Sequence, residues 1–347
     1  MPNTEPGFRL RRARPRVAIV GATGAVGREL LGILAERDFP VEELRLLASP
    51  RSAGRVLAFR DHDIGVEVLG EQSFAGVDLA LFSAGSGTAR DWAPIAVRHG
   101  AVVIDNSSAF RMSPGVPLVV PEINAAEIAH HEGIIANPNC STIIALVPLW
   151  PIHKRNRIRR LIASTYQAAS GGGAAAMDEL VAATRAHLAG EPFTPRALTH
   201  PYAFNLFSHD TKIDPATGYN DEETKVINET RKIFGDAEIR VGVTCIRVPV
   251  LRAHAVAATL ECERPIDPEE ARALIAAAPG CRLVDDPAAN HFPMPLEATG
   301  ADDILVGRIR RDLSDPSGHS LSLFVAGDQL RKGAALNAVQ IAERLLP

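Results

Sequence analysis

A short apolar strand, a glycine-rich loop and an amphipathic helix follow one another near the start of this chain. The apolar run covers residues 17–20, glycines stand at positions 21, 24 and 27, and the amphipathic segment covers residues 29–37. Such glycines allow a tight turn and a close approach of the backbone to a pyrophosphate over the helix N-terminus. Because a second apolar strand follows at 44–48, the sequence predicts a Rossmann-type dinucleotide-binding domain.

The end of that second strand indicates which nicotinamide cofactor the domain binds. NAD sites carry an acid there for the ribose 2′-hydroxyl, whereas NADP sites carry a cation or hydroxyl for the 2′-phosphate. This chain has Ser-Pro-Arg-Ser at 49–52, without an acid. The sequence therefore favours NADP, with Arg51 and Ser52 as the discriminating side chains.

A chain of 347 residues is too long for one ordinary core, so we expect two domains. Further apolar runs at 78–83 and 101–105, separated by a helical pattern at 88–98, continue a mostly parallel first sheet. Beyond Cys140, several strands in succession with helices on one side predict an antiparallel α+β domain. The expected division is a disordered leader at 1–15, an NADP-binding domain at 16–140 with a C-terminal helix within 328–347, and a catalytic and dimerisation domain at 141–327.

The run Asn137-Pro-Asn-Cys-Ser-Thr142 places one cysteine between turn-forming residues and a long apolar segment. Asn-Pro favours a turn, and polar residues before an apolar run favour a helix start. A thiol there would lie over unpaired backbone N–H groups and the positive end of the helix dipole, which both stabilise the thiolate. Cys140 is therefore the predicted nucleophile, in preference to a small buried core residue.

Composition excludes several classes of protein. The formal net charge of −4, from 37 basic and 41 acidic residues, argues against a nucleic-acid binder. The four cysteines are far apart and form no Cys-x-x-Cys pair, which excludes a zinc ribbon or a disulfide framework and suits a reducing cytoplasm. Pro148 and Pro151 interrupt the longest apolar run, so we predict no membrane span, and we expect no metal.

Arg247 and His254 flank a proline-containing segment that can bend the chain and bring both onto one surface. Histidine has the unperturbed pKa best suited to proton transfer near neutrality. The chain has eleven histidines, however, and spacing alone does not select His254 over His209 or His291.

Taken together, the motifs resemble the aspartate-β-semialdehyde dehydrogenase family, and the resemblance covers nearly the whole chain from residue 16 onward. It is carried by these segments: Gly21-Ala-Thr-Gly-Ala-Val-Gly27, Val103-Ile-Asp-Asn-Ser-Ser-Ala-Phe-Arg111, Val119-Val-Pro-Glu-Ile-Asn124, Asn137-Pro-Asn-Cys-Ser-Thr142, Ser164-Thr-Tyr-Gln-Ala-Ala-Ser-Gly171, Thr244-Cys-Ile-Arg-Val-Pro-Val250, Val306-Gly-Arg-Ile-Arg310 and Lys332-Gly-Ala-Ala-Leu-Asn337.

The resemblance implies NADPH-dependent reduction of L-aspartyl 4-phosphate to L-aspartate 4-semialdehyde through a cysteine thioester, in a homodimer or dimer of dimers. It implies that Cys140 is the nucleophile, His254 the acid/base catalyst and Gln167 the residue that orients the acyl intermediate. It assigns Arg111 and Lys225 to phosphate, Arg247 to the substrate α-carboxylate and Glu222 to the α-ammonium. The implied cofactor residues are Thr23, Gly24, Ala25, Val26, Arg51, Ser52, Ser170, Gly171 and Gln329.

Two segments depart from the family pattern. The family usually has Gly-His-Ser around its base, where this chain has Ala253-His254-Ala255, and it usually has Asp-Asn where Asp328-Gln329 stands. The first change keeps the histidine base but can alter the contacts that hold it. The second change replaces one side-chain amide by another. The choice of Glu222 over the adjacent Glu223 rests on the Glu-x-x-Lys spacing.

Three alternatives stand beside this interpretation. N-acetyl-γ-glutamyl-phosphate reductase uses the same fold and a cysteine thioester. A non-catalytic NADP-binding relative, the second alternative, is disfavoured because Cys140, Gln167 and His254 are all present. A purely structural dimer partner, the third, would give no reason for the phosphate-type cations.

Overall fold

The structure, a computed structural model, describes residues 9–347, which form two compact units. The first unit ends at Pro138 and takes up residues 334–347 again at the end of the chain, and the second covers residues 139–333. The borders expected from the sequence lie after residue 140 and before residue 328. The structure therefore assigns Cys140 to the second unit.

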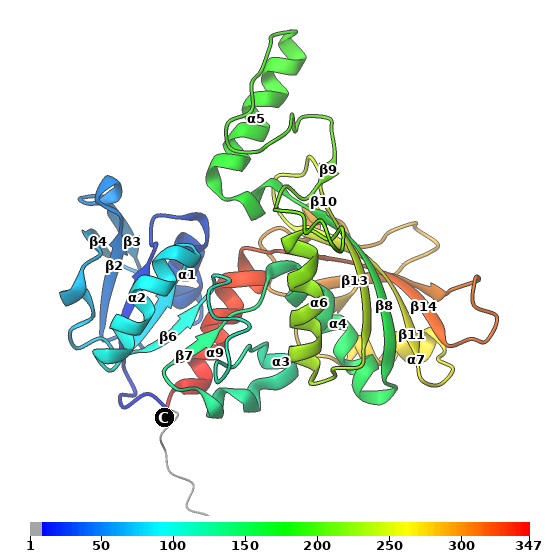
Figure 1. The fold of residues 1–347 in the computed structure, drawn as a ribbon, viewed down its shortest axis with the longest axis horizontal. Helices are drawn as coiled ribbons and strands as arrows, with labels where there is room; N and C mark the ends of the chain where they lie inside the picture. The colour runs from blue at the N-terminus through cyan, green and yellow to red at the C-terminus, as the bar shows by residue number, and fades with distance from the viewer. Residues whose placement is uncertain (1–8) are drawn as a thin grey trace, which may run out of the picture. The chain divides into compact units, whose positions relative to one another are not determined.

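The first unit contains a seven-stranded sheet in the order β3-β4-β2-β1-β5-β6-β7 (Figure 1). All neighbours pair in parallel except β3 and β4, which confirms the mostly parallel sheet. Its strands are β1 (Arg16–Val20), β2 (Glu43–Ala48), β3 (Val56–Phe59), β4 (His62–Val68), β5 (Leu79–Phe82), β6 (Val102–Asp105) and β7 (Ile134–Ala136). Its helices are α1 (Ala25–Glu36), η1 (Pro50–Ser52), η2 (Glu71–Phe74), α2 (Ser86–Arg98), α3 (Pro121–Asn124), η3 (Ala125–His130) and α9 (Leu336–Leu345).

Alternate residues of β1 pack into two different cores. Val17 and Ile19 join the cluster that includes α1 and α9, whereas Ala18 and Val20 join the cluster that includes α2. A parallel strand that is covered on both faces is apolar at every position, as the run at 17–20 is. The prediction that the last helix packs onto the first domain is confirmed by the residues of α9 in the first cluster.

The predicted disordered leader lies partly outside the described residues, which begin at residue 9. The part that is described differs from the prediction. Leu10 is buried in the core of the first unit and its N–H donates to the carbonyl of Leu345, while Arg12 forms an ion pair of 2.9 Å with Glu42. One leucine between the arginines thus ties this segment to the folded unit.

The second unit contains a seven-stranded sheet in the order β12-β13-β14-β11-β8-β10-β9. Its strands are β8 (Ile158–Gln167), β9 (Phe207–Ser208), β10 (Arg240–Arg247), β11 (His254–Cys262), β12 (Cys281–Leu283), β13 (Ile304–Arg311) and β14 (Ser320–Gly327). The expectation of an antiparallel sheet is wrong in detail, because β10 pairs with β8, and β12 with β13, in parallel. These pairs are possible because the connections between their strands contain helices, which let the chain return in the same direction.

Three long helices, α4 (Cys140–Arg155), α6 (Asp221–Phe234) and α7 (Pro268–Ala276), contact this sheet, and α4 contacts both other helices. α5 (Ala174–Ala189) extends away from the sheet (Figure 1). The remaining short elements are η4 (Ala169–Gly172), α8 (Pro295–Ala298) and the π-helical turn η5 (Arg331–Ala335), which leads into α9.

α4 continues through both Pro148 and Pro151 to Arg155. Proline inside a helix removes a backbone hydrogen bond and is normally costly. Ten residues of this helix are buried, and their burial offsets that cost. Within residues 9–347, no helix is long and apolar enough to cross a membrane.

Candidate active site

Cys140 is the first residue of α4, and the predicted helix start is confirmed. Asn139 caps the helix, because its side-chain Oδ1 accepts hydrogen bonds from the N–H groups of Ser141, at 2.9 Å, and Thr142, at 3.3 Å. The thiol therefore lies in the first turn, where the helix dipole favours a negative charge. This is the environment that makes a cysteine nucleophilic.

Glu222, on α6, connects the capping residue Asn139 to other predicted site residues. Its Oε1 accepts hydrogen bonds from Asn139 Nδ2 at 2.8 Å and Gln167 Nε2 at 3.2 Å, and its Oε2 lies 3.3 Å from Lys225 Nζ. Burial favours the neutral carboxyl, but His209, Lys225 and the two hydrogen bonds outweigh it and lower the pKa of Glu222 to about 2. Glu222 is thus a buried carboxylate at the start of α4.

The neighbouring Glu223 has a different task. Its Oε2 accepts from the N–H of Asn220 at 2.9 Å, and Asn220 Oδ1 accepts from the N–H of Glu223, so the two form a capping box. Its Oε1 accepts from the N–H of Cys245 at 3.0 Å. The side chain of Glu223 is thus engaged by the fold, whereas Glu222 contacts the predicted site residues Gln167 and Lys225.

His254 begins β11 and is fully buried. Its Nδ1 accepts a hydrogen bond from the N–H of Ala168 at 3.0 Å, so the neutral ring carries its proton on Nε2. Nε2 is buried and has no hydrogen-bond partner among residues 9–347. Burial, and after it the charge of Arg247, lowers the pKa of His254 to about 3. At neutral pH the ring is therefore uncharged and presents a donor.

Arg247 and His254 both lie beside Gly171. A Cβ atom at Gly171 would come within 3.0 Å of both Arg247 Nη1 and His254 Nε2. The expectation that the bend between them brings both onto one surface is confirmed. Arg247 is 5% exposed, and its Nε has no hydrogen-bond partner among the described residues. A residue larger than glycine at 171 would occupy the space beside both groups.

Two further residues of this cluster were missed by the sequence analysis. Asp210 Oδ1 lies 3.6 Å from Arg247 Nε, and the hydroxyl of Tyr202 donates to the carbonyl of Gln167 at 3.3 Å. Both residues belong to the long segment between α5 and α6, which carries no motif. No signal in the sequence could have selected them.

The structure also shows the surroundings of His209 and His291, the two other histidines considered as the base. His209 lies in the same cluster, where burial, and after it Arg247, lowers its pKa to about 4. His291 pairs with Glu297 at 2.8 Å on the surface. The structure thus separates His291 from the site, while His209 lies near Glu222 and is uncharged at neutral pH.

The first unit has a crevice at the carboxyl ends of β1, β2 and β5, where this fold binds nucleotides. It is lined by Val20, Gly21, Thr23, Gly24, Ala48, Ser49, Pro50, Leu69, Ser83, Ala84, Thr88 and Trp92. A Cβ atom on Gly27 would overlap the carbonyl oxygen of Gly21, which explains the glycine spacing. None of the described side chains caps α1, so its first N–H groups are available to a ligand. Ala25 and Val26 form that first turn.

Arg51 and Ser52 belong to η1, directly after the crevice residues Ser49 and Pro50. Arg51 is exposed, and Thr23 Oγ1 donates to Ser52 Oγ at 3.2 Å. The loop after β2 therefore carries a cation and a hydroxyl at the rim of the crevice.

The other predicted cofactor residues are in the second unit. Gln329 Nε2 donates to Ser170 Oγ, and its Oε1 accepts from the N–H of Ala253 at 3.0 Å. One amide thus connects Ser170 to the residue that precedes His254.

Arg111 belongs to the first unit and is 8% exposed. Its Nε donates to the carbonyl of Asn137 at 3.0 Å and its Nη2 to the carbonyl of Asn106 at 2.8 Å. Main-chain oxygens therefore fix the orientation of this guanidinium.

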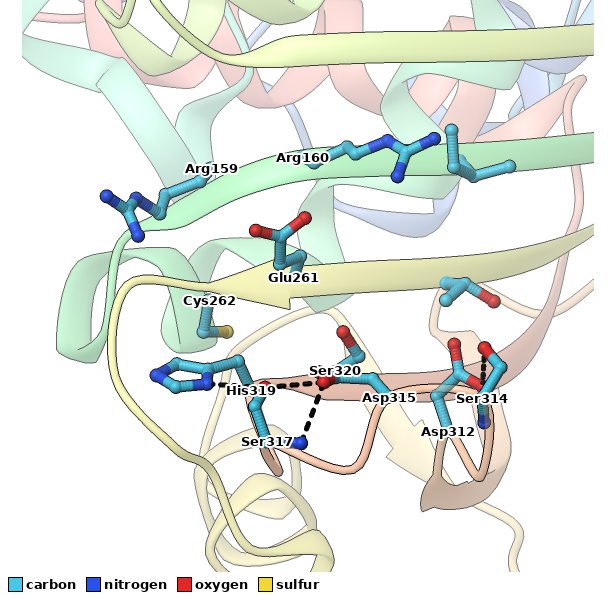
Figure 2. A pocket seen from close by; sticks show the side chains of 12 residues that line it. Arg159, Arg160, Glu261, Cys262, Asp312, Ser314, Asp315, Ser317, His319 and Ser320 are labelled. Carbon is cyan, nitrogen blue, oxygen red and sulfur yellow. Dashed lines mark hydrogen bonds between the residues drawn. The ribbon is translucent and has the colours of Figure 1, made fainter.

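A separate hollow lies over β8, β11 and β14 of the second unit (Figure 2). It is lined by Arg159, Arg160, Ile162, Thr259, Glu261, Cys262, Asp312, Ser314, Asp315, Ser317, His319 and Ser320. Each predicted site residue lies outside this lining.

Family models match most of the chain. Residues 16–131 match the semialdehyde dehydrogenase NAD binding domain, and residues 149–332 match the semialdehyde dehydrogenase dimerisation domain. An aspartate-semialdehyde dehydrogenase of Synechocystis sp. is 54% identical over 331 residues, which are 95% of this chain and 97% of the relative. This chain belongs to the aspartate-semialdehyde dehydrogenase family.

Other aspartate-semialdehyde dehydrogenases also match this chain over nearly its full length. The enzyme of Aquifex aeolicus is 50% identical over 336 residues, covering 95% of this chain and 98% of the relative. The crystal structure of aspartate semialdehyde dehydrogenase II from Vibrio cholerae has a TM-score of 0.92 at 45% identity, and covers 95% of this chain and 98% of that one. The same enzyme complexed with ASA has a TM-score of 0.93 at 44% identity, with 96% and 98% covered.

Ala253 adopts a backbone φ of 71°. An L-residue loses roughly 1–2 kcal/mol in this left-handed region, and glycine loses about 0.5–1 kcal/mol in chain entropy. We therefore expect Ala253→Gly to raise the free energy of unfolding by about 0.5–1 kcal/mol, measured by urea denaturation. Ala255→Gly, in regular strand backbone, is the matched control and should destabilise. Equal effects of both changes would contradict strain at Ala253.

Proposed function

We propose that this chain is an NADP-dependent aspartate-semialdehyde dehydrogenase that reduces L-aspartyl 4-phosphate to L-aspartate 4-semialdehyde and releases phosphate. The observation that carries the proposal is the placement of Cys140 at a capped helix start, linked through Asn139 and Glu222 to Gln167. Membership of the family supplies the activity, an oxidoreductase step of amino-acid biosynthesis. The local geometry supports the roles of the individual residues.

In the proposed reaction, the thiolate of Cys140 attacks the acyl carbon of the substrate. The new S–C bond forms as the bond to the phosphate oxygen breaks, and phosphate leaves with the electron pair. His254 offers its Nε2–H to the acyl oxygen as this oxygen becomes negative, which stabilises the transition state. Once hydride has been added to the thioester carbon, breaking the S–C bond releases the aldehyde and restores the thiolate, so the cycle leaves no net proton on His254.

The remaining side chains bind the parts of the substrate. Arg247 suits the α-carboxylate because its guanidinium offers a planar fork of donors and is buried. Glu222 is ionised at neutral pH and suits the α-ammonium. Lys225 and Arg111 are the proposed phosphate ligands, and Gln167 orients the acyl group beside Cys140.

The crevice of the first unit fits a nicotinamide dinucleotide. The uncapped start of α1 suits a pyrophosphate, and the loop after β2 carries Arg51 and Ser52 where NADP has its 2′-phosphate. When bound, NADPH supplies the hydride that reduces the thioester. Ser170, Gly171 and Gln329 of the second unit complete the proposed set of cofactor residues.

We expect Arg51→Ala to weaken NADPH binding about tenfold and NADH binding less than twofold. The loss of one charge-assisted contact to the 2′-phosphate costs about 1.5 kcal/mol, the lower end of the usual range because Arg51 is exposed. Cofactor fluorescence titration measures both affinities. If the substitution weakens the binding of NADPH and NADH equally, Arg51 does not contact the 2′-phosphate.

The proposed function is tested by NADP⁺ reduction with aspartate semialdehyde, with and without inorganic phosphate. We expect turnover that depends on phosphate and is much slower with N-acetylglutamate semialdehyde. A preference for the acetylated compound would select the N-acetyl-γ-glutamyl-phosphate reductase alternative. Absence of turnover with both would favour a non-catalytic relative.

For assembly, the dimerisation-domain match supports pairing through the second unit. We propose a homodimer, or a dimer of dimers, located in the cytoplasm. Sedimentation with the purified chain distinguishes the two assemblies.

A further inference from the structure

Helix α6 presents two carboxylates to the residue that precedes Cys140. Glu222 and Glu229 are seven residues apart, two helical turns, and therefore lie on one face of α6. Glu222 Oε1 accepts from Asn139 Nδ2 at 2.8 Å, as described above. Glu229 Oε2 accepts from the main-chain N–H of Asn139 at 2.6 Å, and Glu229 is 1% exposed.

Every polar group that Asn139 has for fixing the start of α4 is thereby used. Its side-chain oxygen accepts from the N–H groups of Ser141 and Thr142, its side-chain nitrogen binds Glu222, and its main-chain N–H binds Glu229. The carbonyl of Asn139 accepts from the N–H of Ile143 within α4 at 3.0 Å, whereas Glu229 holds the backbone of Asn139 from another helix, one peptide unit before the nucleophile. Its short length is typical of a charge-assisted hydrogen bond.

A second carboxylate close to Cys140 is electrostatically unfavourable for the thiolate. The reactive form of Cys140 is an anion, and a nearby negative charge disfavours it. The charged and titratable groups that face this region include Glu222 and Lys225 on α6 itself, His209 from the segment before it, and Lys232, which faces Glu229. The benefit of Glu229 to the site must therefore come from its geometry as a hydrogen-bond acceptor.

We propose that Glu229 is a positioning residue for the nucleophile: by holding the N–H of Asn139, it fixes where the thiol of Cys140 stands in the first turn of α4. This inference rests on the proposed function for its kinetic consequence. A displacement of a reacting group by about 1 Å can cost on the order of 100-fold in rate. Glu229 is expected to affect kcat without contacting substrate or cofactor.

Two substitutions of Glu229 distinguish the effect of side-chain length from the effect of the negative charge. Glu229→Gln keeps the acceptor oxygen at the same distance and removes the charge, whereas Glu229→Asp keeps the charge and withdraws the oxygen by about 1.5 Å, one C–C bond. Thr230→Val is the matched control, because Thr230 is fully buried on the same helix and its hydroxyl donates to the helix carbonyl of Val226 at 2.6 Å.

We expect Glu229→Asp to lower kcat by about 30- to 100-fold, with less than twofold change in the KM for aspartate semialdehyde or in the Kd for NADP. Glu229→Gln should recover most of kcat, and Thr230→Val should keep the wild-type value. Alkylation of Cys140 by iodoacetamide, followed by peptide mass spectrometry, should slow about tenfold or more in Glu229→Asp only. Thermal unfolding confirms that all three variants are folded.

The proposal is overturned if Glu229→Gln is as impaired as Glu229→Asp, if the loss appears in KM instead of kcat, or if Cys140 in Glu229→Asp is alkylated at the wild-type rate. The alkylation series needs no substrate. If the wild-type chain does not turn over aspartate semialdehyde, the proposed function fails, while the order of the alkylation rates still decides the role of Glu229.

Discussion

Cys140→Ser is expected to lower kcat by about 10,000-fold or more, the scale seen when a covalent nucleophile is removed. Serine keeps the size of the side chain, but its hydroxyl ionises far less readily than a thiol at the same helix start. The Kd for NADP should change less than twofold, because the dinucleotide crevice belongs to the other unit. Steady-state kinetics and cofactor titration measure the two quantities.

Cys281→Ser is the matched control for that change, since Cys281 lies on the short edge strand β12. It should retain wild-type turnover. Cys245 is not a plausible substitute nucleophile, because burial raises the pKa of its thiol to about 12. Substantial turnover by Cys140→Ser would show that Cys140 is not the nucleophile.

Arg247→Lys is expected to lower kcat/KM for aspartate semialdehyde by about 10- to 150-fold, which corresponds to about 1.5–3 kcal/mol for one lost charge-assisted contact. Lysine keeps the positive charge but loses the planar fork that binds a carboxylate through two parallel bonds. The buried position beside Gly171 leaves lysine little room to find a second geometry.

Arg240→Lys is the control for this change, because Arg240 is an exposed residue of the same strand that pairs with Glu261 at 3.5 Å. It should leave kcat/KM unchanged. If Arg247→Lys also has wild-type kcat/KM, the substrate carboxylate is bound elsewhere.

The partners of Glu222 bear on how the site would distinguish aspartate semialdehyde from N-acetylglutamate semialdehyde. The buried carboxylate of Glu222 has Lys225, Asn139 and Gln167 as partners before any substrate arrives. An N-acetylated substrate would therefore not leave it without a partner. Discrimination between the two semialdehydes must come from the space around Arg247 and from the weaker interaction of a neutral amide with Glu222.

The sequence was most informative where local chemistry decides the structure. The Asn-Pro-Asn frame predicts the helix start at Cys140, and the glycine loop between strand and helix predicts the dinucleotide crevice. β3 and β4 were missed. β3 is the edge strand and β4 lies next to it, and most of their residues are exposed or half-buried, which leaves little apolar periodicity.

Most side-chain contacts of the second unit could not be predicted from the sequence. Glu229 stands on a helix rich in charged residues, where a carboxylate is normally solvated, and only the packing of α6 against α4 brings it to Asn139. His209 and Asp210 come from a segment without regular pattern. Their proximity to Arg247 depends on tertiary structure alone.

The central claim is that an aspartyl thioester forms on Cys140. It is tested most directly by mixing the enzyme with aspartate semialdehyde and NADP⁺ without phosphate, quenching in acid, and mapping the adduct by peptide mass spectrometry. We predict an aspartyl adduct on the peptide that contains Cys140, which disappears when phosphate is added before the quench. Turnover without any adduct at Cys140, or an adduct on another cysteine, would contradict the account.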